Sequence, residues 1–378
     1  MKIRMKFFSI IGLLCASFPA FGIESKAKQA FLIDMTTNTV LFEKNANENM
    51  FPSSMTKMMT LYLLFERLHS GALKLTDTFR VSKKAWKTGG SKMFVQEGTY
   101  VDVENLVRGI ATVSGNDACI VVTEGLFGSD EAGAVEMTKK ARELGMRDTV
   151  FKNSTGLPDP EHITTSFDLA ILGRRLIEDF PEFYHYVGER EFTYNGIKQK
   201  NRNESLSSNL VGVSIDGIKT GRTDLAGYGI TLSAKEKDRR LLLVVNGYKT
   251  MKERTQDAEY LIKWGLREFD VYRFFRAGNI VTDAQVWLGN HPTVPLVTQE
   301  DVAITLPRNV YSRVKLEVIY TGPVEIPIQK GQKIGELIIS APNFLPKTVD
   351  LFAAHDVQKA PFFKRIPAAI YYLIWGKN

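Results

Sequence analysis

The chain has 378 residues, a formal net charge of +7, 2 cysteines and 5 histidines. That length exceeds what one hydrophobic core usually supports, so we expect two domains. The excess positive charge lies at the ends, in the first six residues and in residues 357–378, which hold no acidic residue, and the body between them is neutral. A nucleic-acid-binding protein needs a basic surface, so we expect no nucleic-acid partner.

The histidines are scattered along the chain, and no His-Glu-x-x-His pattern or glycine-rich phosphate loop occurs. A metal hydrolase is therefore not indicated. We expect neither a metal ion nor a cofactor.

The first 22 residues have the character of a secretory signal peptide. Basic residues precede the apolar stretch 7–18, which is short for a membrane anchor, and Ala-Phe-Gly at 20–22 offers small residues for cleavage. Cys15 lacks the small residue expected directly before a lipidated cysteine. Removal of the segment would leave Cys119 as the single cysteine, so we expect an exported protein without an intramolecular disulfide.

A Ser-x-x-Lys motif at 54–57 follows a predicted strand pair over 30–42 and begins an apolar run that predicts a buried helix. The unpaired N–H groups of a helix N-terminus favour an alkoxide or oxyanion. Positions i and i+3 share a helix face, so Lys57 should lie beside the Ser54 hydroxyl. Burial lowers the pKa of a lysine, which lets it accept the serine proton. An N-cap serine followed by a solvated lysine fits the same motif.

A second motif, Ser-Gly-Asn at 114–116, lies between two predicted helices over 103–110 and 118–126. Ser114 and Asn116 should thus occupy a tight connection, where small polar side chains can point into a cleft. A hydroxyl there can relay a proton to a leaving amine, and a carboxamide can hold a substrate amide or the lysine. A helix-capping pair is the ordinary alternative.

The third motif, Lys-Thr-Gly at 219–221, lies in the first of three predicted antiparallel strands. Glycines in these strands suggest a backbone that another chain approaches closely, and a peptide could pair with such an edge. Lys219 and Thr220 would then meet a terminal carboxylate with a charge and a hydroxyl. A second Lys-Thr-Gly, at 87–89, follows no strand pattern and is expected in a surface loop.

A helix over 252–269 is expected to close the first domain, which we place at residues 23–275. Short strands separated by Gly and Pro turns then predict a small all-β domain, a sandwich, over 276–358. The tail, 359–378, combines apolar residues at helical spacing with basic and aromatic residues, which suits an amphipathic helix in a membrane interface. Pro367 interrupts it, and docking on the protein's own surface is the alternative.

In their order and spacing, the three motifs resemble those of the low-molecular-mass penicillin-binding proteins, specifically the D-alanyl-D-alanine carboxypeptidases of bacterial cell-wall metabolism. The resemblance covers essentially the whole chain. It includes the segments 114–119, 153–158, 181–184, 201–203 and 216–221. It implies an α+β fold with a serine β-lactamase/DD-peptidase-like domain, in which helices flank an antiparallel sheet, followed by the β sandwich.

The resemblance also implies residue roles. Ser54 would be the acylated nucleophile and Lys57 its general base, with Ser114 and Asn116 completing the proton network and the grip on the substrate amide. The implied substrate-binding residues are Lys219, Thr220, Gly221, Arg222 and, as a less certain helper, Arg202. The backbone N–H groups of Ser54 and Arg222 would form the oxyanion hole. Arg222 departs from the histidine of some relatives, which puts substrate preference near this strand in question.

The implied reaction removes the terminal D-alanine from peptidoglycan pentapeptides through an acyl-enzyme, which β-lactams would also form. The implied place is the outer face of the bacterial cytoplasmic membrane, in the periplasm, with the tail as a peripheral anchor. Three rivals stay open: cleavage of cross-links, a β-lactamase and a non-catalytic wall-binding protein. A β-lactamase would need a glutamate-held water, for which Glu161 is the candidate, although the Glu-x-x-Leu-Asn pattern is missing there.

Overall fold

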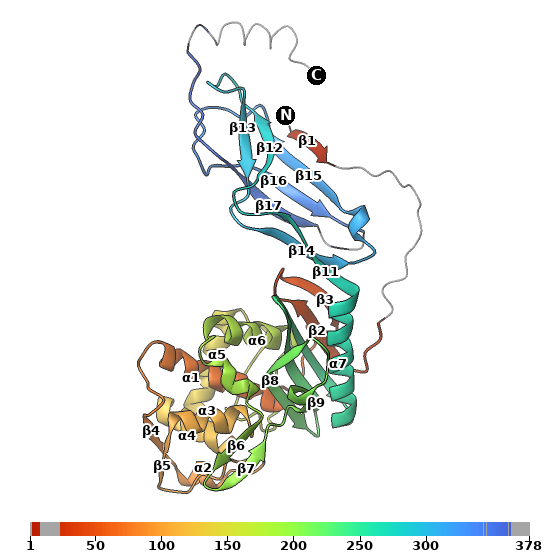
Figure 1. The fold of residues 1–378 in the computed structure, drawn as a ribbon. Coiled ribbons are helices and arrows are strands. Elements are labelled where there is room, and N and C mark those ends of the chain that lie inside the picture. The colour runs from red at the N-terminus through yellow and green to blue at the C-terminus, as the bar shows by residue number, and fades with distance from the viewer. Residues whose placement is uncertain (1, 8–22, 343, 345, 362, 364–378) are drawn as a thin grey trace. The chain divides into compact units, whose positions relative to one another are not determined.

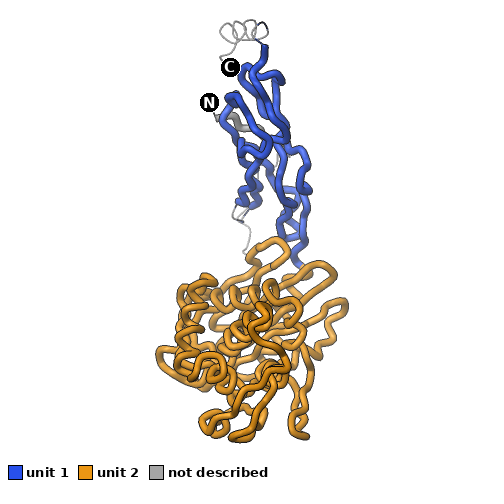
Figure 2. Tube along the Cα trace, turned by 90° about the vertical axis from the view of Figure 1, so that its left-hand side faces the viewer, with its two compact units in different colours: residues 1–20, 268–378 blue, residues 21–267 orange. Residues whose placement is uncertain are grey.

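The computed structural model describes residues 2–7, 23–342, 344, 346–361 and 363. The chain divides into two compact units (Figure 2). The first, which we call the mixed unit, ends at Arg267, and the second, the β unit, begins at Glu268 and also includes the N-terminal strand β1.

The mixed unit is built on a five-stranded antiparallel sheet with the strand order β3-β2-β10-β9-β8 (Figure 1). The strands are β2 (Gln29–Asp34), β3 (Thr39–Lys44), β8 (Ser214–Thr223), β9 (Gly227–Glu236) and β10 (Arg239–Tyr248). They confirm the expected strand pair and the three predicted strands around the third motif. The hairpins β4 (Thr78–Arg80) with β5 (Tyr100–Asp102) and β6 (Glu191–Tyr194) with β7 (Ile197–Lys200) complete the strands of this unit.

Helices cover both faces of the five-stranded sheet. On β10, Leu241 packs against Gly265 of α7, and the next residue, Leu242, packs against Gly173 of α6 on the opposite face. Successive side chains of a strand point to opposite faces, so a central strand with both faces covered is apolar throughout. This explains the unbroken apolar run in β10, where neither face meets water.

The helices and helical turns of the mixed unit follow in chain order. They are η1 (Ser53–Thr56), α1 (Lys57–His69), α2 (Lys83–Lys87), α3 (Val103–Ala111), α4 (Asn116–Phe127), α5 (Asp130–Leu144), α6 (Ser166–Asp179), η2 (Tyr184–Gly188), η3 (Glu204–Ser207) and α7 (Met251–Glu268). Several begin at a side-chain cap that accepts a backbone N–H, such as Asp102 before α3 and Thr165 before α6. No helix in the described part of the chain is long and apolar enough to cross a membrane.

The β unit pairs a six-stranded sheet, ordered β1-β15-β16-β17-β13-β12, with the two-stranded sheet β11-β14. The strands are β1 (Lys2–Phe7), β11 (Phe269–Phe275), β12 (Ile280–Gln285), β13 (Thr293–Val297), β14 (Val302–Pro307), β15 (Lys315–Thr321), β16 (Lys333–Ser340) and β17 (Lys347–Ala353), with the turn η4 (Tyr311–Arg313) before β15. Leu306 of β14 shares one apolar core with Val318 and Leu337 of the larger sheet. The two sheets thus form the expected sandwich.

The boundary between the units lies earlier than the expected break after residue 275. Strand β11 pairs with β14, so it belongs to the β unit. The apolar residues of β11 follow α7 without a turn signal, and this continuity conceals the change from helix to strand. Most of the predicted signal peptide and nearly all of the predicted tail helix lie outside the described residues, so both stay predictions.

Candidate active site

Ser54 and Lys57 meet at the start of α1, but the backbone there differs from the expected α-helical turn. Residues 53–56 form the 3₁₀ turn η1, and α1 begins at Lys57. In a 3₁₀ turn, side chains at i and i+3 eclipse one another, which brings this pair together more directly than an α-turn would. The Lys57 Nζ lies 3.0 Å from Ser54 Oγ. The two side chains therefore lie side by side, as predicted, but on a tighter turn than expected.

Lys57 is fully buried and touches three oxygen atoms. Besides Ser54 Oγ, its Nζ donates to Asn116 Oδ1 at 2.8 Å and to the Thr155 carbonyl at 2.5 Å. Burial lowers the pKa of Lys57, while Cys119 and Asp117 act in the opposite direction. A solvated lysine, the ordinary alternative for this motif, is excluded by the burial. Burial thus shifts the protonation equilibrium of Lys57 toward the neutral amine, which is the form that can accept a proton.

Ser114 lies in the connection between α3 and α4, as predicted, and Asn116 directly follows that connection. Ser114 has a left-handed backbone with φ of 62°, an uncommon conformation outside glycine that re-aims the chain toward the cleft. Asn116 begins α4, and its Nδ2 donates to the Gly89 carbonyl at 2.7 Å while its Oδ1 accepts from Lys57. The spare Lys-Thr-Gly at 87–89 begins at the last residue of α2 and continues into the loop that follows, where the Gly89 carbonyl helps to orient Asn116.

The Lys-Thr-Gly motif lies on β8, the last strand in the order of the sheet, so within the described residues one edge of β8 carries no strand. Lys219 is buried, and burial together with the nearby Lys57 moves its pKa well below the usual value. A Cβ on Gly221 would lie 3.0 Å from the Pro52 carbonyl, so glycine allows β8 to approach the turn that carries Ser54.

A cleft of about 370 Å³ unites the motifs. Its lining includes Ser54, Ser114, Asn116, Arg202, Thr220, Gly221 and Arg222. These seven are site residues that the sequence predicted. The other two predicted residues, Lys57 and Lys219, are buried beside the cleft. Three segments that are distant in the sequence therefore line one cleft.

The two exposed arginines lie at the cleft with partners of their own. Arg222 has its guanidinium carbon 5.2 Å from the centre of the Tyr228 ring and forms an ion pair with Asp224 at 3.3 Å. Arg202 donates to Gln199 Oε1 at 3.2 Å. Both residues line the cleft.

Sequence reasoning missed Arg254, in the first turns of α7. Its side chain is 2% exposed and lines the cleft, and its Nε has no hydrogen-bond partner within the described residues. Burial lowers its pKa. A buried guanidinium with an unused donor at a cleft is suited to an anionic ligand. An arginine in a polar helical segment carries no local signal of this role, and only the fold reveals it.

The β-lactamase candidate Glu161 is not in the cleft lining. It is exposed and pairs with Lys152 at 2.9 Å. Its neighbour His162 is buried with Nε2 2.9 Å from Thr56 Oγ1, and burial lowers the pKa of His162 to about 4. Among the described residues, no group of three or more His, Cys, Asp or Glu side chains could hold a metal ion.

Two families match this chain. Residues 16–250 match the family described as D-alanyl-D-alanine carboxypeptidase, and residues 269–359 match the C-terminal domain of penicillin-binding protein 5. The chain is 37% identical over 348 residues to the D-alanyl-D-alanine carboxypeptidase DacC of Escherichia coli, covering 90% of this chain and 86% of that protein. It is 33% identical to DacF of Bacillus subtilis, with 89% and 87% covered.

Solved structures give the same result. Penicillin-binding protein 5 from Haemophilus influenzae superposes with a TM-score of 0.81 at 32% identity, covering 90% of this chain and all of that one. DacD from Francisella tularensis gives 0.78 at 27% identity, with 89% and 95% covered. The cleft, its three motifs and these likenesses agree over both units, and the chain belongs to the D-alanyl-D-alanine carboxypeptidase family.

Proposed function

We propose that this protein is a serine carboxypeptidase that removes the terminal D-alanine from peptidoglycan pentapeptides, with Ser54 as the nucleophile. The observation that carries the proposal is the position of Lys57. A neutral amine has two hydrogens and one lone pair. With the hydrogens directed to Asn116 Oδ1 and the Thr155 carbonyl, the lone pair faces Ser54 Oγ at 3.0 Å. Lys57 is thus oriented to take the Ser54 proton.

The first half of the reaction forms the acyl-enzyme. Ser54 Oγ attacks the carbonyl between the two D-alanines as its proton passes to Lys57. The backbone N–H groups of Ser54 and Arg222 stabilise the oxyanion. A proton then reaches the leaving amine through Ser114, which lines the same cleft, and D-alanine departs. Water next hydrolyses the ester, with Lys57 again as base.

The terminal carboxylate of the substrate is bound beside β8. Thr220 offers a hydroxyl at the cleft, and the buried Lys219 lies next to it. Arg254 adds an unused Nε donor to the same cleft. The Arg254 guanidinium already donates from Nη2 to Thr255 Oγ1 at 3.0 Å, and a carboxylate bound there would supply the acceptor that its Nε lacks. Arg202 is an outer helper at the mouth.

We assign the same serine as the site of β-lactam acylation. One related solved structure, penicillin-binding protein D2 of Listeria monocytogenes, is described in an ampicillin-bound form; it is 27% identical with a TM-score of 0.59 and 65% of this chain covered. The exposed position of Glu161 supports a carboxypeptidase over a β-lactamase, because among the described residues that line the cleft there is no glutamate to hold a deacylating water.

The test is release of free D-alanine from a pentapeptide by the purified chain, compared with the variants Ser54→Ala and Ser312→Ala. Ser312 begins another Ser-x-x-Lys pattern, in the β unit, so it is a matched control. We expect release to vanish in Ser54→Ala and to persist in Ser312→Ala. Release that survives in Ser54→Ala refutes the nucleophile, and cleavage of cross-linked peptides without D-alanine release from pentapeptide would make the protein an endopeptidase.

We further propose export and peripheral attachment to the outer face of the cytoplasmic membrane through residues 359–378. The support is the composition of the two ends of the sequence. Sedimentation with vesicles containing anionic lipids, for the chain with and without residues 359–378, tests the attachment. Equal sedimentation of the two proteins would refute it.

A further inference from the structure

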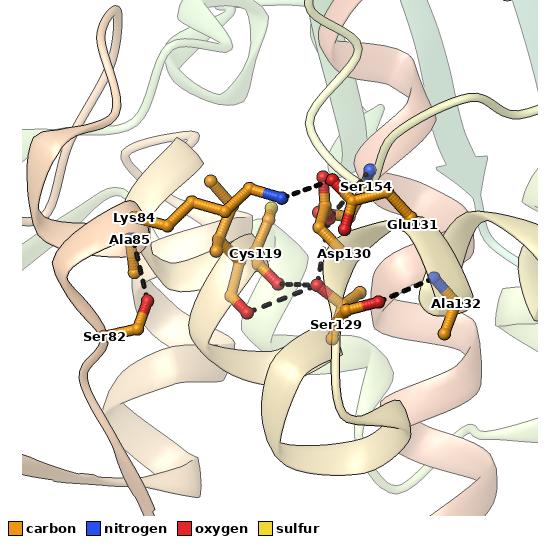
Figure 3. Close-up of polar contacts among 11 residues, drawn as sticks. Ser82, Lys84, Ala85, Cys119, Ser129, Asp130, Glu131, Ala132 and Ser154 are labelled. Carbon is orange, nitrogen blue, oxygen red and sulfur yellow. Dashed lines mark hydrogen bonds and ion pairs between the residues drawn. The ribbon is translucent and has the colours of Figure 1, made fainter.

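Asp130, at the start of α5, is a buried carboxylate that the reaction above does not use. It is 6% exposed, although the adjacent Glu131 and the nearby Lys84 are exposed. The helix start does not need it as a cap, because Ser129 already accepts the N–H of Ala132 at 3.0 Å (Figure 3). A buried carboxylate is retained where its hydrogen bonds serve the structure around it.

Asp130 binds the loop that follows Asn153. Its Oδ1 accepts from Ser154 Oγ at 2.5 Å and from Ser154 N at 3.3 Å (Figure 3). The same oxygen lies 3.0 Å from Thr123 Oγ1 of α4. The Ser154 carbonyl in turn accepts from Thr60 Oγ1 of α1 at 2.9 Å. Ser154 is therefore fixed at its N–H, its side chain and its carbonyl.

Thr155, the next residue, is fixed on its other side. Its N–H and its Oγ1 donate to Asn153 Oδ1 at 3.1 and 2.8 Å. The peptide group between Ser154 and Thr155 is thus held from both ends, and the carbonyl that follows is the one that accepts from Lys57. A displaced Thr155 carbonyl would leave one hydrogen of the amine without its acceptor, and the lone pair would turn away from Ser54.

We propose that Asp130 is a positioning residue for the general base: through Ser154 it fixes the Thr155 carbonyl, which sets the direction of the Lys57 lone pair. The inference rests on the proposed role of Lys57 as the base of Ser54. Asp130 touches neither substrate nor nucleophile, and its effect reaches the reaction through two residues of one loop. Misplacing a catalytic group by about 1 Å can slow a reaction by about a hundredfold.

Charged and titratable groups surround Lys57 from several elements. Those that face it are Asp117 and Cys119 of α4, Lys219 of β8 and His162. Asp130 itself is faced by Lys84 of α2 and by Cys119. Apart from Asp130 itself, none of these groups is changed in the test below, and Ser154→Ala removes no charge, so a shift in the pH dependence of that variant reports on the loop.

The experiment measures the rate constant of acylation by a chromogenic β-lactam as a function of pH. The variants are Asp130→Asn, Ser154→Ala, their combination and Glu131→Gln. Glu131 is the adjacent acid and a matched control, because it is exposed and pairs with Lys84 at 2.7 Å (Figure 3). The active fraction of each protein is titrated first, so that unfolded protein does not count as slow protein.

We expect Asp130→Asn to slow acylation by about tenfold to a hundredfold, with the half-saturating β-lactam concentration nearly unchanged. A loosened loop admits water to Lys57, which raises the pKa of that lysine, so the acid limb of the profile should move to higher pH. Ser154→Ala should act in the same direction more weakly, and the double variant should be no slower than Asp130→Asn. The acylation rate constant and pH profile of Glu131→Gln should equal those of the wild-type protein.

An Asp130→Asn protein with an unchanged rate constant and pH profile would overturn the proposal. So would slower acylation with an unmoved acid limb, which would indicate a purely structural role. If Asp130→Asn does not fold, Ser154→Ala decides by the same two readouts. If β-lactams do not acylate the wild-type protein at all, the proposed function itself is refuted, and this inference with it.

Discussion

The two units of this protein differ in whether they bury charged side chains. The mixed unit buries Lys57, Lys219 and Arg254 almost completely, and it also buries Asp117 and Asp130. Among the described residues of the β unit, the buried polar side chains are threonines, and the buried apolar side chains are aliphatic apart from Phe269 and Tyr320. Burying an ionisable group reduces stability unless hydrogen bonds offset the lost hydration. The difference indicates that the mixed unit is built around its chemistry, whereas the β unit is built for packing.

The largest expected effect follows from removing the buried base. Lys57→Met keeps the side-chain length and deletes the amine, so acylation by a β-lactam should slow by roughly a thousandfold or more. The melting temperature should be largely retained, since an apolar group suits a fully buried position. Stopped-flow acylation and a thermal melt measure both. A variant with near-normal acylation would remove Lys57 from the mechanism.

A core substitution in the β unit should lower stability and leave acylation unchanged, the reverse of the effect expected for Lys57→Met. Leu337→Ala opens a cavity in its core, where Leu337 is 1% exposed, and should destabilise this unit by about 2–5 kcal/mol. The acylation rate constant at 25 °C should not change, because none of the cleft residues lies in this unit. Urea unfolding and acylation kinetics on the same protein test the pair of expectations. A parallel fall in both would show that the units are not independent in function.

Acid should weaken the mixed unit selectively through His162. Burial lowers its pKa from the usual 6.5 to about 4, so the unfolded chain takes up a proton at a higher pH than the folded chain does. Stability should therefore be lost as the pH falls from about 6.5 to about 4, by about 3 kcal/mol in total. Urea titrations at several pH values measure this loss, and a His162→Asn variant should show a smaller one. Equal pH dependence in both proteins would contradict the assignment.

The smallest of these effects concerns the substrate carboxylate. Arg254→Gln removes one charge-assisted donor from the cleft and should lower kcat/KM for D-alanine release by about tenfold to a hundredfold. Lys252→Gln, an exposed change on the same helix, is the matched control. An amide analogue of the substrate, which lacks the terminal carboxylate, should be affected much less. Equal losses on both substrates would indicate that Arg254 does not bind the carboxylate.

The sequence was sufficient to predict the parts of the site that are carried by side chains in short motifs. Ser54, Asn116 and Thr220 come together because their motifs lie at a helix start, a helix connection and an edge strand, each of which has a readable pattern. The Thr155 carbonyl could not be predicted in this way, since a backbone acceptor has no side-chain signature. Arg254 was missed because its role depends on where α7 packs.

Two features of the fold also could not be predicted from the sequence pattern. The 3₁₀ turn at 53–56 and a helical first turn have the same sequence requirements, because both are satisfied by small polar residues before an apolar run. The unit boundary after residue 267 was missed because α7 passes directly into β11 without an intervening turn or proline, and Gly265 lies inside the helix. By contrast, the strands of the sandwich were predictable because turns punctuate them.

The most direct test of the central claim is to locate the covalent adduct after reaction with a β-lactam. Mass spectrometry of the digested chain should place the adduct on Ser54, and the Ser54→Ala protein should carry none. An adduct on Ser114 or on another residue, or an undiminished adduct in Ser54→Ala, would contradict the account.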